Sequence, residues 1–240
     1  LSFVGSTPIA NYIYERSAHF GKRVQALGGA KNHMVIMPDA DIDKAVDALV
    51  GAAYGSAGER CMAISVAVLV GSAADKVMPA LIERTKTLKI KNGMELDAEM
   101  GPIVTAAAKT RISGYIQAGI NEGAAILVDG RNFQLPEFAA GFWLGGTLFD
   151  HVKPHMKIYQ EEIFGPVLSV TTVKDDEEAI RVANNSDYGL AAGLWTANVS
   201  KVHRLARQIR AGTVWVNCYE EGDLTVPFGG FKMSGNGRDK

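Results

Sequence analysis

Apolar side chains recur at helical spacing in several separate stretches of the chain. The spacing is clearest after Pro38, where three aspartates precede a run of apolar positions three or four residues apart, typical of a helix with one buried face. That pattern predicts a helix from residue 42 to about Tyr54. The same spacing predicts further helices over residues 7–20, 75–88, 106–122, 176–184 and 200–210.

Short apolar runs separate these helices and indicate buried strands. They cover residues 34–37, 64–70, 125–128, 142–149, 167–173, 190–195 and 213–217. Strands that alternate with helices of 10 to 15 residues are typical of the α/β class, with a mostly parallel sheet covered by helices on both faces. Residues 129–141 show no periodicity, and the chain contains no internal repeat.

Composition and charge exclude several function classes. The 240 residues are 47% apolar and 21% charged, with a formal net charge of −1, as in an ordinary soluble globular protein. No block of like charges provides a surface for nucleic acid. No apolar run approaches the roughly 20 residues of a membrane span, and the opening residues LSFVGSTP lack the pattern of a signal peptide.

Cysteine and histidine contents bear on compartment and metal binding. The only cysteines are Cys61 and Cys218, so no disulfide framework is expected, which fits a reducing cytoplasm or mitochondrial matrix. The five histidines do not cluster. His151 and His155 are four residues apart, but Pro154 disrupts the helix that would place them on one face. We therefore predict no metal site.

The stretch GSAGERCMAIS, residues 55–65, carries the best candidate for chemistry. A cysteine is a strong nucleophile only as thiolate, and a partly exposed turn with unpaired amides and an adjacent cation, Arg60, favours that form. Gly55 and Gly58 suggest a bent backbone that turns the Cys61 side chain into a cleft. The alternative is a small apolar residue buried at a helix end. Cys218 follows the apolar run TVWV and is predicted to pack against the core.

A second candidate lies at the start of the first predicted helix. The segment FVGST places a glycine, Ser6 and Thr7 where first-turn amides and the helix dipole favour an anion such as phosphate. The alternative is that Ser6 is an ordinary N-cap residue.

Eight ordered segments together resemble one family. They are FVGST, LGGAKNH, DADID, GERCMA, EEIFGP, NNSDYGLAAGLWT, AGTVWVNC and PFGGFKMSGNGR, and they resemble the NAD(P)-dependent aldehyde dehydrogenase superfamily. The resemblance implies an oxidoreductase whose cysteine attacks a small-molecule aldehyde. The thiohemiacetal passes a hydride to the nicotinamide and becomes a thioester.

The resemblance also assigns roles to individual residues. Cys61 corresponds to the family's nucleophile, and Ser6 to a contact with the cofactor phosphates. Glu162 of EEIFGP corresponds to the carboxylate that hydrogen-bonds the nicotinamide ribose, and Phe164 to the residue that packs near that ribose and ring. Without the motif, Glu162 reads as a solvated acid on a loop and Phe164 as a core residue. The amide of Cys61 itself is a candidate donor to the oxyanion.

One departure from the family concerns the fate of the thioester. Hydrolytic members carry a glutamate 34 residues before the nucleophile, and Leu27 occupies that position here, between Ala26 and Gly28. With GAKNH and GERCMA, this resembles methylmalonate-semialdehyde dehydrogenase, which releases its thioester to coenzyme A. From about Thr171 onward the sequence instead resembles hydrolytic aldehyde dehydrogenases, including those acting on amino- and γ-glutamylamino-aldehydes. This contrast suggests a chimera.

A second departure concerns length, because members of this family are about twice as long. The resemblance implies three parts: residues 1–28 as a remnant of a dinucleotide-binding domain, residues 29–231 as the catalytic domain, and residues 232–240 as the start of a C-terminal segment. The main alternatives to a CoA-acylating enzyme are a hydrolytic aldehyde dehydrogenase and a folded fragment without turnover. Family members are expected to form homo-oligomers, and the choice between NAD and NADP stays open.

Overall fold

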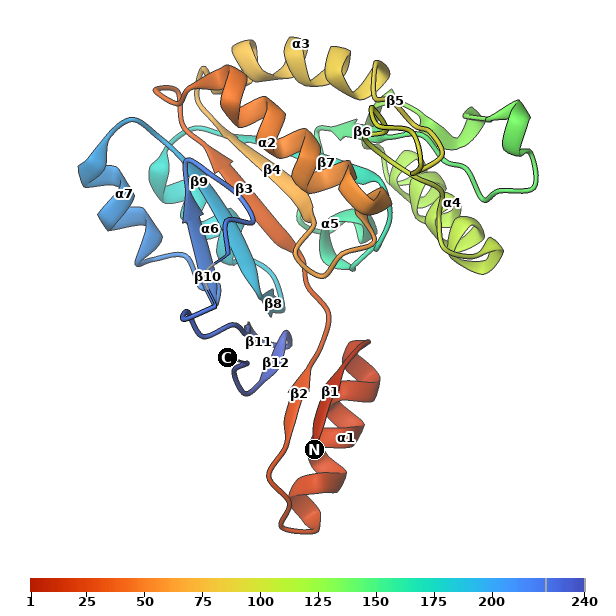
Figure 1. Ribbon diagram of the computed structural model, residues 1–240. Helices are drawn as coiled ribbons and strands as arrows, with labels where there is room; N and C mark the ends of the chain where they lie inside the picture. Colours follow the sequence, from red (N-terminus) through yellow and green to blue (C-terminus); the bar gives the residue numbers. More distant parts are fainter. Residues whose placement is uncertain (223, 240) are drawn as a thin grey trace.

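A seven-stranded sheet forms the body of the computed structural model, which describes residues 1–222 and 224–239 (Figure 1). The strand order is β10-β9-β3-β4-β7-β6-β5, and every neighbouring pair is parallel except β5 and β6. The strands are β3 (Asn32–Ile36), β4 (Ile64–Val70), β5 (Ala125–Val128), β6 (Thr147–Asp150), β7 (Val167–Val173), β9 (Ala191–Trp195) and β10 (Thr213–Val216). The predicted α/β class with a mostly parallel sheet is confirmed.

Helices cover both faces of this sheet. On one face α2 (Ile42–Tyr54) and α3 (Ala73–Lys86) pack against β4, while α6 (Asp176–Asn184) packs against β3 and β4 from the other (Figure 1). The order of the strands explains why helices lie on both faces. The connection from β3 to β4 and that from β7 to β9 run in opposite directions along the sheet, and right-handed crossovers then place their helices, α2 and α6, on opposite faces. The remaining helices are α4 (Ala106–Asn121), α5 (Lys157–Gln160) and α7 (Val199–Ala206), with 3-10 turns at Gly55–Gly58, Gly130–Asn132 and Pro136–Phe138.

The centre of the sheet is buried on both sides, which explains the continuous apolar runs in the sequence. Every residue of β3 is buried, as are all residues of β4 except Ser65. A parallel strand enclosed by helices cannot alternate apolar with polar positions, because neither of its faces meets water. The buried face of α2 closes the same core, with seven buried residues among its 13.

A smaller sheet lies apart from the main one, at the end where both chain termini are found (Figure 1). Its strands are β1 (Ser2–Val4), β2 (Gln25–Leu27) and β12 (Gly235–Asn236), and α1 (Thr7–His19) connects the first two. β2 pairs with β1 in parallel and with β12 in antiparallel orientation. Residues 1–28 and the last predicted segment therefore share one sheet. The three domain ranges themselves stay predictions.

Several elements differ from the sequence-based expectation. β1, β2 and β12, and the antiparallel pair β8 (Tyr188–Gly189) and β11 (Phe231–Lys232), were not predicted because two or three residues are too few to show a period. The strand predicted over residues 142–149 is shorter in the structure and covers only β6, Thr147–Asp150. Just before it, the amide of Gly145 donates to the carbonyl of Gly130, outside the sheet. Likewise α7 ends four residues early, where the amides of Gln208 and Ile209 both turn back to the carbonyl of Leu205.

Neither a membrane-spanning helix nor a cluster of metal-binding side chains is found in the residues that the structure describes. No helix in residues 1–222 or 224–239 combines the length and apolar character needed to cross a bilayer. Within the same residues, no group of three or more His, Cys, Asp or Glu side chains could hold a metal ion.

Candidate active site

Cys61 lies on a tightly bent turn between α2 and β4. Three consecutive residues, Ser56, Ala57 and Gly58, have left-handed backbone conformations, with φ of 51°, 55° and 65°. A Cβ on Gly58 would lie 2.2 Å from the carbonyl oxygen of Gly165, so no larger residue fits there. The bend brings Cys61 to a half-buried position just before the N-terminal end of β4, the central strand of the sheet.

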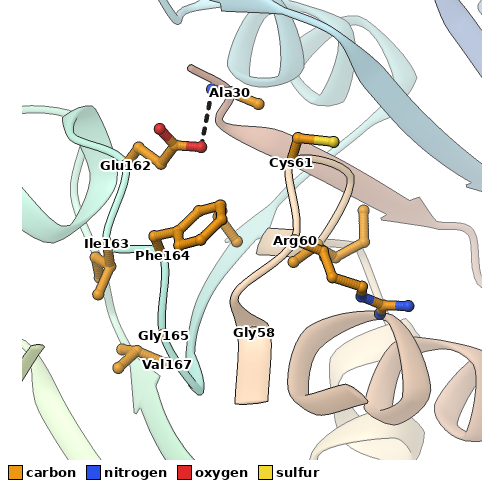
Figure 2. Close-up of a pocket in the computed structure, with 12 residues that line it drawn as sticks. Ala30, Gly58, Arg60, Cys61, Glu162, Ile163, Phe164, Gly165 and Val167 are labelled. Carbon is orange, nitrogen blue, oxygen red and sulfur yellow. Dashed lines mark hydrogen bonds between the residues drawn. The ribbon is translucent and has the colours of Figure 1, made fainter. Parts of the chain in front are cut away.

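Arg60 does not activate this thiol, contrary to the sequence-based expectation. Its guanidinium forms an ion pair with Glu220 and donates to the carbonyls of Gly51 and Ala52 at 2.9 and 3.1 Å. Figure 2 shows the side chain extended away from Cys61. Its charge is compensated by Glu220, and Arg60 anchors the turn to the end of α2.

The pKa of the Cys61 thiol is accordingly raised, where the sequence suggested a lowered value. Burial is the largest cause, and the carboxylates of Glu162 and Glu220 act in the same direction. Hydrogen bonding from the amides of Met62 and Cys61 lowers the pKa but does not reverse the shift. The expected unpaired amides are thus present and lower the pKa of the thiol. The adjacent cation, Arg60, is also present, but its charge is paired with Glu220.

Glu162 faces Cys61 from the turn that follows α5 (Figure 2). One carboxylate oxygen, Oε1, accepts a hydrogen bond of 3.1 Å from the amide of Ala30. The side chain is half-buried, and burial raises its pKa although the Ala30 amide, Lys31 and Arg111 oppose that shift. Glu162 is therefore a fixed carboxylate at the cavity wall and not the solvated acid that its loop position alone suggested.

Lys31 holds the turn that carries Glu162. Its ammonium group donates to the carbonyls of Ile158 and Glu161, both at 2.7 Å, and the residue is only 3% exposed. Burial lowers the pKa of Lys31 to about 7, against the attraction of Glu162 and Glu161. This role could not be predicted from the sequence, because a single lysine in an apolar segment forms no recognisable pattern.

Phe164 adopts a left-handed backbone with φ of 52°, which is uncommon for a bulky residue. Its ring lies between the segments of Glu162 and Cys61 and remains 39% exposed, so Phe164 is not a core residue (Figure 2). Arg111 of α4 holds this backbone by donating to the carbonyls of Ile163 and Phe164. Arg111 and Tyr115 were missed at the sequence level, although their i, i+4 spacing already placed them on one helix face.

Ser6 precedes the first turn of α1 as its N-cap residue. Its side chain makes no capping hydrogen bond, and the residue is exposed. The neighbouring Thr7 side chain accepts a hydrogen bond of 3.0 Å from the amide of Gly29, which ties the start of α1 to the segment leading into β3. A free hydroxyl at a helix N-terminus is suited to an anionic oxygen.

The four residues singled out in the sequence line one cavity of about 520 Å³. Its lining comprises Val4, Gly5, Ser6, Gly28, Gly29, Cys61, Arg111, Tyr115, Glu162 and Phe164. A Cβ on Gly29 would lie 2.6 Å from Glu162 Oε2, so glycine keeps that carboxylate accessible. The cavity joins a thiol, a carboxylate and a helix N-terminus, a donor and acceptor set that fits the ribose and phosphate groups of a dinucleotide.

Cys218 lies outside the core, contrary to prediction. β10 ends at Val216, and Asn217 then takes a left-handed conformation with φ of 55°, so the chain leaves the sheet before reaching the cysteine. Cys218 is half-buried, in the same class as Cys61. Burial alone therefore does not separate the two thiols.

Comparison with known proteins identifies related sequences and structures. The model described as the aldehyde dehydrogenase family matches residues 1–240. A malonate-semialdehyde dehydrogenase from Pseudomonas aeruginosa is 52% identical over an alignment that covers 98% of this chain and 48% of that protein. A structure from Sinorhizobium meliloti 1021, assigned as a methylmalonate-semialdehyde dehydrogenase and complexed with NAD, has a TM-score of 0.95 at 48% identity, covering 98% and 48% of the two chains.

A more distant relative has the same fold. A betaine aldehyde dehydrogenase from Staphylococcus aureus, in complex with NAD+, has a TM-score of 0.95 at 35% identity and covers 99% of this chain and 47% of that one. The chain thus spans about half the length of the relatives it matches. Each alignment runs through both halves of the chain, which gives no support to the suggestion of a chimera.

Proposed function

The chain belongs to the aldehyde dehydrogenase family, and from that premise we propose that it is the catalytic portion of an NAD-dependent enzyme that oxidises an aldehyde through Cys61. The observation that carries the proposal is the convergence of Ser6, Cys61, Glu162 and Phe164 on one cavity. These residues come from three separate segments, and nothing but the fold brings them together.

In this mechanism the Cys61 thiolate attacks the aldehyde carbon and forms a thiohemiacetal. Negative charge develops on the former carbonyl oxygen, and the amide of Cys61 would donate a hydrogen bond to it. The collapsing thiohemiacetal leaves a thioester on Cys61. Only the thiolate attacks, so the thiol must first lose its proton. Burial raises the pKa of the thiol, so the thiolate is a minor form near neutral pH and the rate of the first step rises with pH.

NAD, when bound, accepts the hydride that the thiohemiacetal loses. Glu162 would hold the nicotinamide ribose through a carboxylate already oriented by the Ala30 amide. Phe164 would pack beside that ribose and ring, and Ser6 would meet the phosphates at the N-terminus of α1. NAD in the complexes of the relatives supports this choice of cofactor.

Coenzyme A is proposed as the acceptor of the acyl group. Leu27 is 6% exposed and directly precedes Gly28 and Gly29 of the cavity wall, where hydrolytic members of the family place a glutamate. Without a base there, water is a poor nucleophile, whereas the CoA thiolate attacks the thioester carbonyl, takes over the acyl group and releases the Cys61 thiolate. The names of the malonate-semialdehyde relatives support a semialdehyde as the substrate.

The test measures both products. The chain is mixed with NAD and either propanal or malonate semialdehyde, with and without CoA, and NADH is followed together with acyl-CoA and free acid. Acyl-CoA should exceed free acid, and Leu27→Glu should raise free acid by roughly a hundredfold because it supplies a base. Leu27→Gln, which has the same shape but accepts no proton, is the control. If no NADH forms under any condition, the alternative of a folded fragment without turnover is supported.

Two further expectations stay proposals. The family resemblance implies that the full-length protein assembles as a homo-oligomer, and sedimentation of a full-length protein that contains this chain would test it. A location in the cytoplasm rests on the two unpaired cysteines, and the bacterial relatives give no support to the alternative of a mitochondrial matrix.

A further inference from the structure

Asn32 connects the Cys61 turn to two strands of the main sheet. It is 2% exposed, and its amide nitrogen donates to the carbonyls of Cys61 and Ala63, both at 2.9 Å. Its side-chain oxygen accepts from the amide of Ala191 at 3.1 Å. The pairing of β3 with β4 shifts register between Asn32 and His33, so the side chain takes bonds that the regular ladder would have made.

These bonds allow only one orientation of the Asn32 amide. Its NH2 group faces two carbonyl acceptors, and its oxygen faces an N–H donor. A flipped side chain would place its oxygen against the two carbonyl oxygens and its NH2 group against the N–H, so all three hydrogen bonds would be lost. A buried side chain with three hydrogen bonds is held rigidly, because breaking any of them would leave a buried polar group with neither a protein partner nor water. Asn32 therefore fixes the direction of the Cys61 carbonyl.

That direction determines where the next amide points. In a trans peptide the C=O and the following N–H are antiparallel, so fixing the Cys61 carbonyl also fixes the N–H of Met62. Within the described part of the chain, the amides of Cys61 and Met62 donate to no backbone carbonyl, and both lower the pKa of the thiol. We propose that Asn32 is a positioning residue that holds the Cys61–Met62 peptide, and with it the Met62 N–H, in a fixed orientation beside the thiol. This rests on the proposed role of Cys61 as nucleophile.

The following peptide provides a contrast. The carbonyl of Met62 accepts a hydrogen bond of 2.7 Å from the hydroxyl of Tyr219, and the N–H of Ala63 donates to the carbonyl of Arg60 at 3.1 Å. Both groups of this peptide are hydrogen-bonded, and its N–H is engaged by the Arg60 carbonyl. Loss of the Tyr219 hydroxyl should loosen the turn without removing a donor to sulfur.

The charges around the thiol set the background for any pH measurement. Glu162 faces it from the turn after α5, Glu220 from the loop after β10, and both raise its pKa. Arg60 lies in the same turn and is neutralised by Glu220, and Tyr219 lies on the same loop as Glu220. None of these groups is altered by a change at Asn32, so a shift in Asn32 variants reports on the amide.

The experiment measures the rate of Cys61 alkylation by iodoacetamide from pH 6 to 10, with mass mapping to separate Cys61 from Cys218. Asn32→Ala should slow alkylation at pH 8 about tenfold and move the profile about one unit upward, while the limiting rate at high pH changes little. Tyr219→Phe, a control that removes a single hydrogen bond to the turn, should change the rate less than about twofold. Circular dichroism checks the fold of each variant.

An unchanged profile in Asn32→Ala would overturn the proposal, and so would equal shifts in both variants, which would indicate general loosening. If Asn32→Ala does not fold, Asn32→Ser replaces it, since one hydroxyl cannot donate to both carbonyls. A Ser variant whose profile coincides with that of the parent would also overturn it. Alkylation needs neither NAD nor aldehyde, so a chain that oxidises no aldehyde counts against the proposed function and leaves this inference testable.

Discussion

Two helices of equal length, α1 and α2, lead to opposite parts of the candidate site and are held very differently. Each has 13 residues, and Ser6 precedes α1 as Cys61 follows α2. α2 buries seven residues against the main sheet, while α1 buries only Ala10 and Ser17. Apolar burial is the main source of helix stability in proteins, so α2 is fixed by the core and α1 is anchored weakly.

This difference in burial indicates that the thiol side of the cavity is held more firmly than the phosphate-facing side. The thiol side of the cavity is built from the core outward, through α2, the left-handed turn and Asn32. The phosphate-facing side depends on a small sheet and on a helix with exposed apolar residues such as Ile9 and Tyr12. Thiol reactions should therefore tolerate changes in α1, whereas changes in α2 should affect stability and site together.

The largest expected effect comes from removing the thiol. With p-nitrophenyl acetate, the parent chain should release a burst of about one equivalent of nitrophenol and then turn over slowly, because no base assists hydrolysis of the acyl-enzyme. Cys61→Ala should abolish the burst entirely, and Ser6→Ala should leave it intact. Cys218→Ala is the control, and a burst that survives in Cys61→Ala would show that another group is acylated.

A pair of core and surface truncations tests the difference in anchoring directly. Leu49 of α2 is fully buried, and Leu49→Ala should lower the free energy of unfolding by about 2–5 kcal/mol. Ile9 of α1 is 49% exposed, and Ile9→Ala should cost less than about 1 kcal/mol. Urea denaturation followed by circular dichroism measures both. Equal losses would mean that α1 is packed as tightly as α2.

The raised pKa of the Cys61 thiol predicts a steep pH dependence on the firmly held side. Burial favours the neutral thiol, so the thiolate fraction below the pKa grows about tenfold per pH unit, and alkylation should keep rising to at least pH 9. Glu162→Gln removes a negative charge that raises this pKa and should move the profile to lower pH. A plateau below pH 8 in the parent would contradict the effect of burial.

The smallest effect concerns the helix caps. Ser6 makes no side-chain capping bond, so Ser6→Ala should lower stability by less than about 0.5 kcal/mol. Thr105, the N-cap of α4, accepts a hydrogen bond of 3.1 Å from the Ala108 amide, and Thr105→Ala should cost about 1 kcal/mol. Thermal unfolding of the two variants compares them. A larger loss in Ser6→Ala would show that its hydroxyl supports the fold and is not free for a ligand.

Much of the main body could be predicted from the sequence, because its signals are local. The apolar period of α2, the runs that became β4 and β7, and the acidic first turn of α6 each stand within a dozen residues. The small sheet could not be predicted in this way. Its strands are two or three residues long, and β12 finds β2 across some 200 positions of the chain. Pairing at that distance leaves no period in either segment.

The amino-acid sequence was sufficient to predict the fold class and, through ordered motifs, four of the residues that line the cavity, Ser6, Cys61, Glu162 and Phe164. The electrostatic environment of these residues depends on the folded chain. Arg60 is next to Cys61 in the chain, yet its charge goes to Glu220, while the distant Glu162 faces the thiol and raises its pKa. Chain adjacency fixes only the distance between two backbone positions. The environment of a charge depends on which side chains and amides surround it after folding, and for Cys61 those include Asn32 and Glu162.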